Sequence, residues 1–212
     1  SFADRAVVIT GAGGAFCSGQ DLGAREQGQP TYVAMRTVTE TFTALHQLRQ
    51  PVIAKVVGVA AGAGLNLALG CDLVVASDDA RFSEIFAKRG LSIDAGGSWI
   101  LPRMIGLHRA KELVFFGDVI SAADAKEFGI VNQLVARDEI DAFVDAWAAR
   151  LAAGPPLALA MSKELLNAGL DRTMTQALEA EAIAQSYNFS TKDTAEAMLA
   201  FMEKRDPRFR GR

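Results

Sequence analysis

The stretch from residue 51 to residue 72 constrains the fold more than any other part of the sequence. An apolar, β-branched run at residues 52–59 predicts a buried strand. The small residues at 60–64 follow without a polar loop, and residues 65–71 fit a helix buried on all sides. A helix N-terminus leaves backbone N–H groups unpaired and carries partial positive charge, so this one suits an anion or a polarised carbonyl oxygen.

A second strand upstream also opens into small residues. The apolar residues 6–9 lead into the sequence GAGGAFCSG. Two such loops, each presenting one backbone N–H, would form a two-donor oxyanion hole. For either stretch alone, close packing of a strand against a helix explains the glycines equally well. A dinucleotide-binding motif is not favoured, because Phe16 occupies the position of its third glycine.

Composition narrows the function classes. The chain has 212 residues, of which 50% are hydrophobic, so it fits one domain with a sizeable core. Its 22 basic and 25 acidic residues nearly cancel, which argues against nucleic acid as a partner, and every apolar run is too short to cross a membrane. Two cysteines and two distant histidines predict neither a disulfide framework nor a metal site. We expect a cytoplasmic protein.

The order of the predicted elements indicates an α/β fold. Strands and helices alternate through residues 1–137, and residues 138–212 are mainly helical. We therefore expect a layered core with a helical C-terminal region in the same structural unit.

Asp94 is the most informative carboxylate of the sequence. It stands between Ile93 and the small residues Ala95, Gly96 and Gly97, just before a predicted helix. Its simplest role is that of a helix N-cap, worth about 1 kcal/mol. A catalytic role is the alternative, and the residues around Asp94 do not decide between the two.

Several segments together resemble the crotonase superfamily, also called the enoyl-CoA hydratase/isomerase family. They are GAFCSGQDL, PVIAKVVGVAAGAGLNLALGCDLVVAS, ARF, GLSIDAGGSWILPRMIGLHRAKEL, ISAADAKEFGIVNQLV and AFMEKRDPRF. The resemblance implies a spiral of ββα turns with a helical trimerisation region, a homotrimer or dimer of trimers, and an acyl-CoA thioester substrate. Coenzyme A would be part of the substrate, and no further cofactor is implied. Family members carry further N-terminal strands, which we expect to be missing here.

The resemblance also implies roles for single residues. Backbone N–H groups of Ser18 and Ala63 would form the oxyanion hole, with Gly62 in the turn before Ala63. Binding of substrate or coenzyme A would involve residues along the pantetheine path and in the last helix, namely Gln20, Asp21, Leu22, Phe201 and Lys204. The polar loop at residues 23–31 would lie beside the site.

The departures from the family pattern favour an isomerase. Hydratases of this family use two glutamates, and this chain has Asn66 and Phe86 at those positions. Neither side chain can exchange a proton at neutral pH. Glu84 could replace them only if its strand slipped in register, which is costly where one face is buried.

Asp94 stands where several isomerases of the superfamily carry their working aspartate, and the chain is most similar to the 1,2-epoxyphenylacetyl-CoA isomerase type. We expect Asp94 to move the proton, with its pKa raised by an apolar wall of Phe86 and Trp99. A hydratase, a nucleophilic role of Asp94 towards an aryl-CoA, and a non-catalytic acyl-CoA binder remain open.

Overall fold

Two sheets form the centre of the fold. The computed structural model describes residues 4–20 and 30–212. Strands β1 (Val7–Thr10), β2 (Val52–Val56), β4 (Leu73–Ser77) and β7 (Gln133–Val135) form one sheet in that order. Strands β3 (Val59–Ala61), β5 (Arg81–Ser83) and β6 (Ile120–Ser121) form the other. The pairs β2–β4, β4–β7 and β3–β5 are parallel, and β6 runs antiparallel to β5.

The predicted single strand at residues 52–59 is wrong, because the chain changes sheets within it. β2 ends at Val56 and β3 begins at Val59 in the other sheet. Gly58 between them has a φ of 65°, which side chains rarely adopt, and a Cβ there would lie 2.4 Å from the carbonyl oxygen of Gly14. The sequence does not reveal this bend, because apolar, β-branched residues stand on both sides of Gly58.

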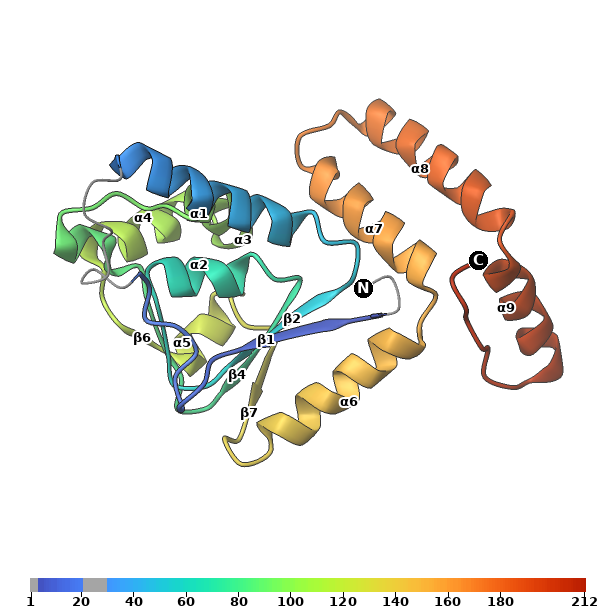
Figure 1. The fold of residues 1–212 in the computed structure, drawn as a ribbon, viewed down its shortest axis with the longest axis horizontal. Helices are drawn as coiled ribbons and strands as arrows, with labels where there is room; N and C mark the ends of the chain where they lie inside the picture. Colours follow the sequence, from blue (N-terminus) through green and yellow to red (C-terminus); the bar gives the residue numbers. More distant parts are fainter. Residues whose placement is uncertain (1–3, 21–29) are drawn as a thin grey trace. The chain divides into compact units, whose positions relative to one another are not determined.

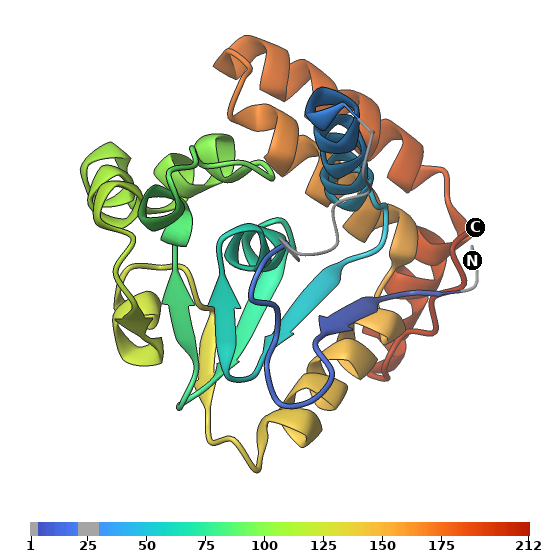
Figure 2. The same ribbon diagram turned by 60° about the vertical axis from the view of Figure 1, so that its left-hand side comes forward.

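Helix α2 (Ala63–Leu69) follows β3 directly and is the most enclosed helix of the fold. Leu65, Ala68 and Leu69 are buried, in agreement with a helix packed on all sides. Figures 1 and 2 show α2 between the strands and the long helix α1 (Thr31–His46). At its C-terminal end, Gly70 contacts the side chain of Leu45 from α1.

Four further helical segments lie between β5 and β7. They are η1 (Ile85–Arg89, a 3-10 helix), α3 (Gly97–Ile105), α4 (Leu107–Phe116) and α5 (Ala122–Glu127). α5 begins with a capping box, in which the Ser121 hydroxyl accepts a hydrogen bond from the Asp124 N–H and the Ser121 N–H donates to the Asp124 carboxylate. Phe86 belongs to η1 and Trp99 to α3, and Asp94 lies between these two segments in the sequence.

The chain divides into two compact units. One contains Val8–His46 and Val52–Asp145, and therefore both sheets and helices α1 to α5. The other contains Ser1–Val7, Gln47–Pro51 and Ala146–Arg212. The α/β character and the helical C-terminal region agree with the expectation from sequence.

Helices dominate the second unit. After most of α6 (Ile140–Ala153), it contains α7 (Pro156–Gly169), α8 (Met174–Phe189) and α9 (Lys192–Glu203). The C-terminal residues fold back onto the start of α9, where the backbone N–H groups of Arg210 and Gly211 donate to the buried carboxylate of Asp193 at 2.7 and 2.8 Å. Among the described residues, no helix has the length and apolarity needed to span a membrane.

Candidate active site

The segment around Cys17 is pressed against the first turn of α2. Cys17 pairs with Ala60, and its carbonyl oxygen accepts a hydrogen bond of 2.9 Å from the Ala61 N–H. A Cβ on Gly64, the second residue of α2, would lie 2.1 Å from the same oxygen. Only glycine fits at this position, so the absence of a side chain lets the two segments meet.

The backbone N–H groups of Ser18 and Ala63 emerge close to this contact. A Cβ on Gly19 would lie 3.9 Å from the Ala63 nitrogen. Gly62, before Ala63, has φ 55° and ψ −127° and donates its own N–H to the Ser83 oxygen at 2.8 Å. No acceptor for the Ser18 or Ala63 N–H is found among the described residues. Both N–H groups are therefore unpaired within the described part of the chain, and the one on Ala63 lies close to Gly19, which follows Ser18.

Asp94 faces this part of the fold but does not cap α3. The N-cap of α3 is Gly96, and no side chain accepts its free N–H groups, so the N-cap role for Asp94 is wrong. The Asp94 backbone oxygen accepts hydrogen bonds from the Gly97 N–H at 2.9 Å and from the Asn66 Nδ2 at 3.0 Å. The carboxylate atom Oδ1 is buried and has no partner among the described residues. Burial raises the pKa of Asp94, in the expected direction.

A second carboxyl group, Glu84, lies in the same region. It follows β5, its side chain is 1% exposed, and neither of its oxygens has a hydrogen-bond partner in the described part of the chain. Burial raises the pKa of Glu84 to about 8; the nearby Asn66 side chain lowers that pKa, and the charge of Asp94 raises it further. No slip in register is needed to bring Glu84 here. The available sequence signal was a charged residue directly after an apolar strand.

Phe86 and Asn66 both lie close to the Gly62 turn: the Asn66 N–H donates to the Gly62 oxygen at 3.1 Å. A Cβ on Gly62 would lie 3.6 Å from Cζ of Phe86, so the buried aromatic ring faces that turn. Asn66 is fully buried in the middle of α2. The apolar wall of Phe86 and Trp99 around Asp94 stays a prediction.

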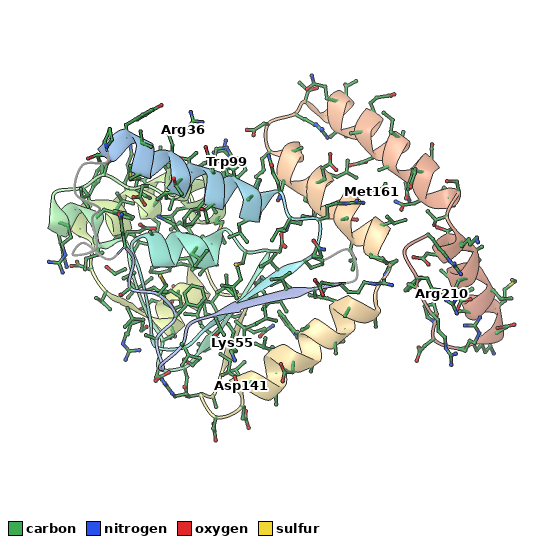
Figure 3. The ribbon with its side chains drawn as sticks, viewed as in Figure 1. Arg36, Lys55, Trp99, Asp141, Met161 and Arg210 are labelled. Atoms are coloured by element: carbon green, nitrogen blue, oxygen red, sulfur yellow. The ribbon has the colours of Figure 1, made fainter. Side chains whose placement is uncertain are left out.

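A cavity of about 270 Å³ lies beyond the other end of α2. Its lining among the described residues includes Phe42 and His46 of α1, Gly70 after α2, and Trp99 of α3. The rings of His46 and Trp99 meet edge to face at 5.6 Å, and the Arg103 guanidinium lies 4.2 Å from the centre of the Trp99 ring. Ala95 and Gly96, which follow Asp94, also line the cavity, and Figure 3 labels Trp99 near α1.

Three of the remaining predicted binding residues, Gln20, Phe201 and Lys204, belong to the described part of the chain. Gln20 is exposed, whereas Asp21, Leu22 and most of the polar loop lie outside the described residues. Phe201 is 84% exposed on α9 and Lys204 ends that helix with φ 54°; both belong to the second unit. In the described residues, no group of three or more potential metal ligands occurs.

Comparison with known proteins gives a consistent assignment. The sequence profile described as Enoyl-CoA hydratase/isomerase matches residues 3–212. A probable enoyl-CoA hydratase of Rhodobacter capsulatus is 41% identical over 98% of this chain and 82% of its own length. A 1,2-epoxyphenylacetyl-CoA isomerase of Escherichia coli is 37% identical over the same shares of the two chains. The crystal structure of an enoyl-CoA hydratase from Bacillus anthracis superposes with a TM-score of 0.93, at 36% identity, over 98% of this chain and 82% of that one.

Proposed function

The chain belongs to the enoyl-CoA hydratase/isomerase family, and we propose that within this family it is an acyl-CoA isomerase. Membership implies an enzyme that acts on a CoA thioester. The observation that carries the finer assignment is the partly buried carboxylate of Asp94, which has an unpartnered oxygen and a raised pKa near two free backbone donors.

The two donors would hold the thioester oxygen. When a proton leaves the carbon next to the thioester, negative charge moves onto that oxygen. The N–H groups of Ser18 and Ala63 stabilise this enolate without having to reorganise, because the Gly62 turn and the Cys17 contact already fix them. Neither donor depends on a side chain, so the alanine at residue 63 supplies the same group as glycine would.

Asp94 would move the proton. Its carboxylate takes the proton from the first carbon and returns it to a second carbon of the same substrate, so the double bond shifts and no water is consumed. A raised pKa makes the carboxylate a stronger base and keeps it able to act as the acid in the second step. One carboxylate therefore completes the reaction.

The acyl group would run along α2 into the cavity near Trp99. The donors lie at the N-terminal end of α2, Asn66 holds the Asp94 backbone at its middle, and Gly70 lines the cavity beyond its C-terminal end. At about 1.5 Å per residue, the helix spans roughly 10 Å. The rings of Phe42, His46 and Trp99 suit an apolar or aromatic acyl group.

The test is a product assay in deuterated water against 3-enoyl-CoA, 2-enoyl-CoA and ring-epoxide aryl-CoA substrates. We expect double-bond or ring isomerisation with deuterium exchange at carbon. Asp94→Asn should lower kcat at least about a hundredfold, the usual contribution of one acid–base group. Asp118→Asn is the matched control, since it removes an exposed carboxylate whose partner is Lys88. Full activity in Asp94→Asn would contradict the proposal.

Hydration of an enoyl-CoA is the second candidate. It is favoured by the presence of two carboxyl groups, Glu84 and Asp94, in one region, and by the similarity to the Rhodobacter protein. Hydration requires a carboxylate to contact the incoming water, and the 1% exposure of Glu84 argues against that role. The same assay separates the candidates, because a hydratase would yield a 3-hydroxyacyl product and an isomerase would not; hydration that persists in Asp94→Asn would also exclude Asp94 from the reaction.

Two other possibilities make different predictions in that assay. Nucleophilic attack by Asp94 on an aryl-CoA would leave a covalent adduct on the protein, detectable by mass spectrometry. A non-catalytic acyl-CoA binder would bind the thioesters and convert none of them.

A further inference from the structure

Three residues of the candidate site, on three neighbouring elements, carry buried polar side-chain atoms that have no partner among the described residues. They are Glu84 after β5, Asn66 in α2 and Asp94 before α3. Buried polar atoms are normally hydrogen-bonded, and a cluster of exceptions indicates a proton or a ligand that completes the set. The site proposed above uses the Asp94 carboxylate and leaves the atoms of Glu84 and Asn66 unexplained.

Counting donors and acceptors identifies the missing proton. The Asn66 amide offers two hydrogens on Nδ2 and an acceptor on Oδ1, and one hydrogen goes to the Asp94 backbone oxygen at 3.0 Å. The Glu84 carboxyl group is close enough to the Asn66 side chain for the two to interact. If Glu84 were ionised, it could accept the second hydrogen but would have none to donate, and Asn66 Oδ1 would stay without a partner among the described residues.

A protonated Glu84 satisfies all the atoms of this pair. Its carbonyl oxygen accepts the second Nδ2 hydrogen, and its O–H donates to Asn66 Oδ1, which closes a cyclic pair of an acid and an amide. Gly97 lies directly against this amide, since a Cβ on Gly97 would lie 2.3 Å from Oδ1 and 2.4 Å from Nδ2, and a side chain at residue 97 would displace Asn66. The remaining Nδ2 hydrogen stays on the Asp94 backbone.

We propose that Glu84 is a neutral carboxylic acid that forms a cyclic hydrogen-bonded pair with the Asn66 amide and thereby positions Asp94. Glu84 is a positioning residue, since its carboxyl group is almost fully enclosed and acts through Asn66. This assignment rests on the proposed function only where its effect on turnover is concerned.

The charges around Glu84 support the neutral form. α2, β3 and β6 carry no titratable side chain, and the charged side chains of β5, η1, α4 and α5, together with Arg103 of α3, are exposed or partly exposed. Arg81, the nearest cation in sequence, is exposed and donates to the backbone oxygens of Asp79 and Ala80, and Lys88 pairs with Asp118. Burial is the main reason that the pKa of Glu84 is raised to about 8, and the negative charge of Asp94 adds a smaller effect in the same direction, because it disfavours a second carboxylate.

Infrared difference spectroscopy tests the ionisation without any substrate. The spectrum of the wild type minus Glu84→Gln at pH 6.5 should show the C=O band of a protonated carboxylic acid, and this band should disappear as the pH passes about 8. Glu112→Gln, which alters an exposed glutamate of α4, should show only carboxylate bands in the same comparison. Carboxylate bands for Glu84 at pH 6.5 would overturn the assignment.

Kinetics test the positioning. A glutamine amide can form the same cyclic pair with Asn66, so Glu84→Gln should keep kcat at pH 7 within about threefold and lose the decline in kcat above pH 8. Glu84→Met, which leaves Asn66 Oδ1 unpaired, should lower kcat at least about tenfold with little change in KM. Thermal unfolding shows whether each variant is folded at the assay temperature. A Glu84→Met protein that is folded and keeps the wild-type kcat and pH profile would refute the positioning role, whereas absent turnover in the wild type on every substrate would refute the proposed function alone.

Discussion

At the scale of single residues, the environment divides the roles of two carboxyl groups that lie ten positions apart. Asp94 is only partly buried, although its Oδ1 is enclosed and has no partner among the described residues, whereas Glu84 is 1% exposed and neither of its oxygens has a partner there. Both have a raised pKa, chiefly because burial disfavours the charged form. The more exposed group is therefore the better proton carrier, and the enclosed one the better fixed hydrogen-bond donor.

The stability of the protein should depend on pH through Glu84. Its pKa is raised from 4.5 to about 8 in the folded state, so the folded state binds the proton more tightly than the unfolded state does. The stabilisation is fully present below pH 4.5 and is lost as the pH rises to about 8, a change on the order of 5 kcal/mol in the free energy of unfolding. Glu84→Gln cannot ionise and should not show this loss.

Denaturant unfolding of both proteins from about pH 4.5 to about pH 8.5 measures this difference, since the window brackets the two pKa values of Glu84. We expect Glu84→Gln to gain stability relative to the wild type as the pH increases across that window. The raised pKa of Asp94 contributes to both proteins and largely cancels in the comparison. Parallel curves for the two proteins would mean that Glu84 ionises normally in the folded state.

Sequence reasoning reached Asp94 but not Glu84, for a physical reason. The position of Asp94 next to small residues and a helix start is a local pattern, and its raised pKa agrees with the expectation. The environment of Glu84, which follows β5, includes Asn66 of α2 and Asp94 before α3. Contacts of that kind join segments distant in sequence, and no local pattern encodes them.

At the scale of elements, the contact between α2 and the segment before Ser18 is the part of the site that is most sensitive to an increase in side-chain volume. Gly64→Ala would place a methyl group 2.1 Å from the Cys17 oxygen, in a position where both sides are backbone. We expect a loss of at least about 2 kcal/mol in unfolding free energy, because a buried contact must move to relieve the clash. The oxyanion donors would separate, so kcat should also fall.

Gly169→Ala is the matched control for this substitution. Gly169 is the last residue of α7, and a Cβ there meets no atom within 4 Å. Alanine is the better helix former, so this variant should be unchanged or up to about 1 kcal/mol more stable. Thermal or denaturant unfolding measures the stability of both variants. Equal stabilities would show that the contact between α2 and Cys17 adjusts to an added methyl group at little cost in free energy.

The strand and helix types around α2 were accessible from sequence, but the change of sheet at Gly58 was not. A buried strand in either sheet has the same apolar, β-branched composition, so residues 52–59 read as one element. Gly58 separates β2 from β3. It has a φ of 65°, and a Cβ there would lie 2.4 Å from the carbonyl oxygen of Gly14. That approach involves a loop far upstream in the sequence.

At the scale of the whole molecule, helices α7 and α8 leave large apolar side chains exposed. Neither helix contains a buried residue, although both contain large apolar side chains. Leu166, Met174, Ile183 and Phe189 are each at least 65% exposed. Apolar surface of this extent on two adjacent helices is uncommon in a monomer and indicates a surface that is covered in the working protein.

A second copy of the chain is the partner we expect for this surface, in line with the homotrimer or dimer of trimers implied by the resemblance. Ile183→Glu combined with Phe189→Glu would place two charges on α8, so the mass measured by sedimentation equilibrium should fall towards that of the 22.6 kDa chain. Val119→Glu, an exposed apolar residue of the other unit, is the control and should leave the mass unchanged. A wild-type protein that sediments as a monomer at micromolar concentration would rule out self-association through α7 and α8.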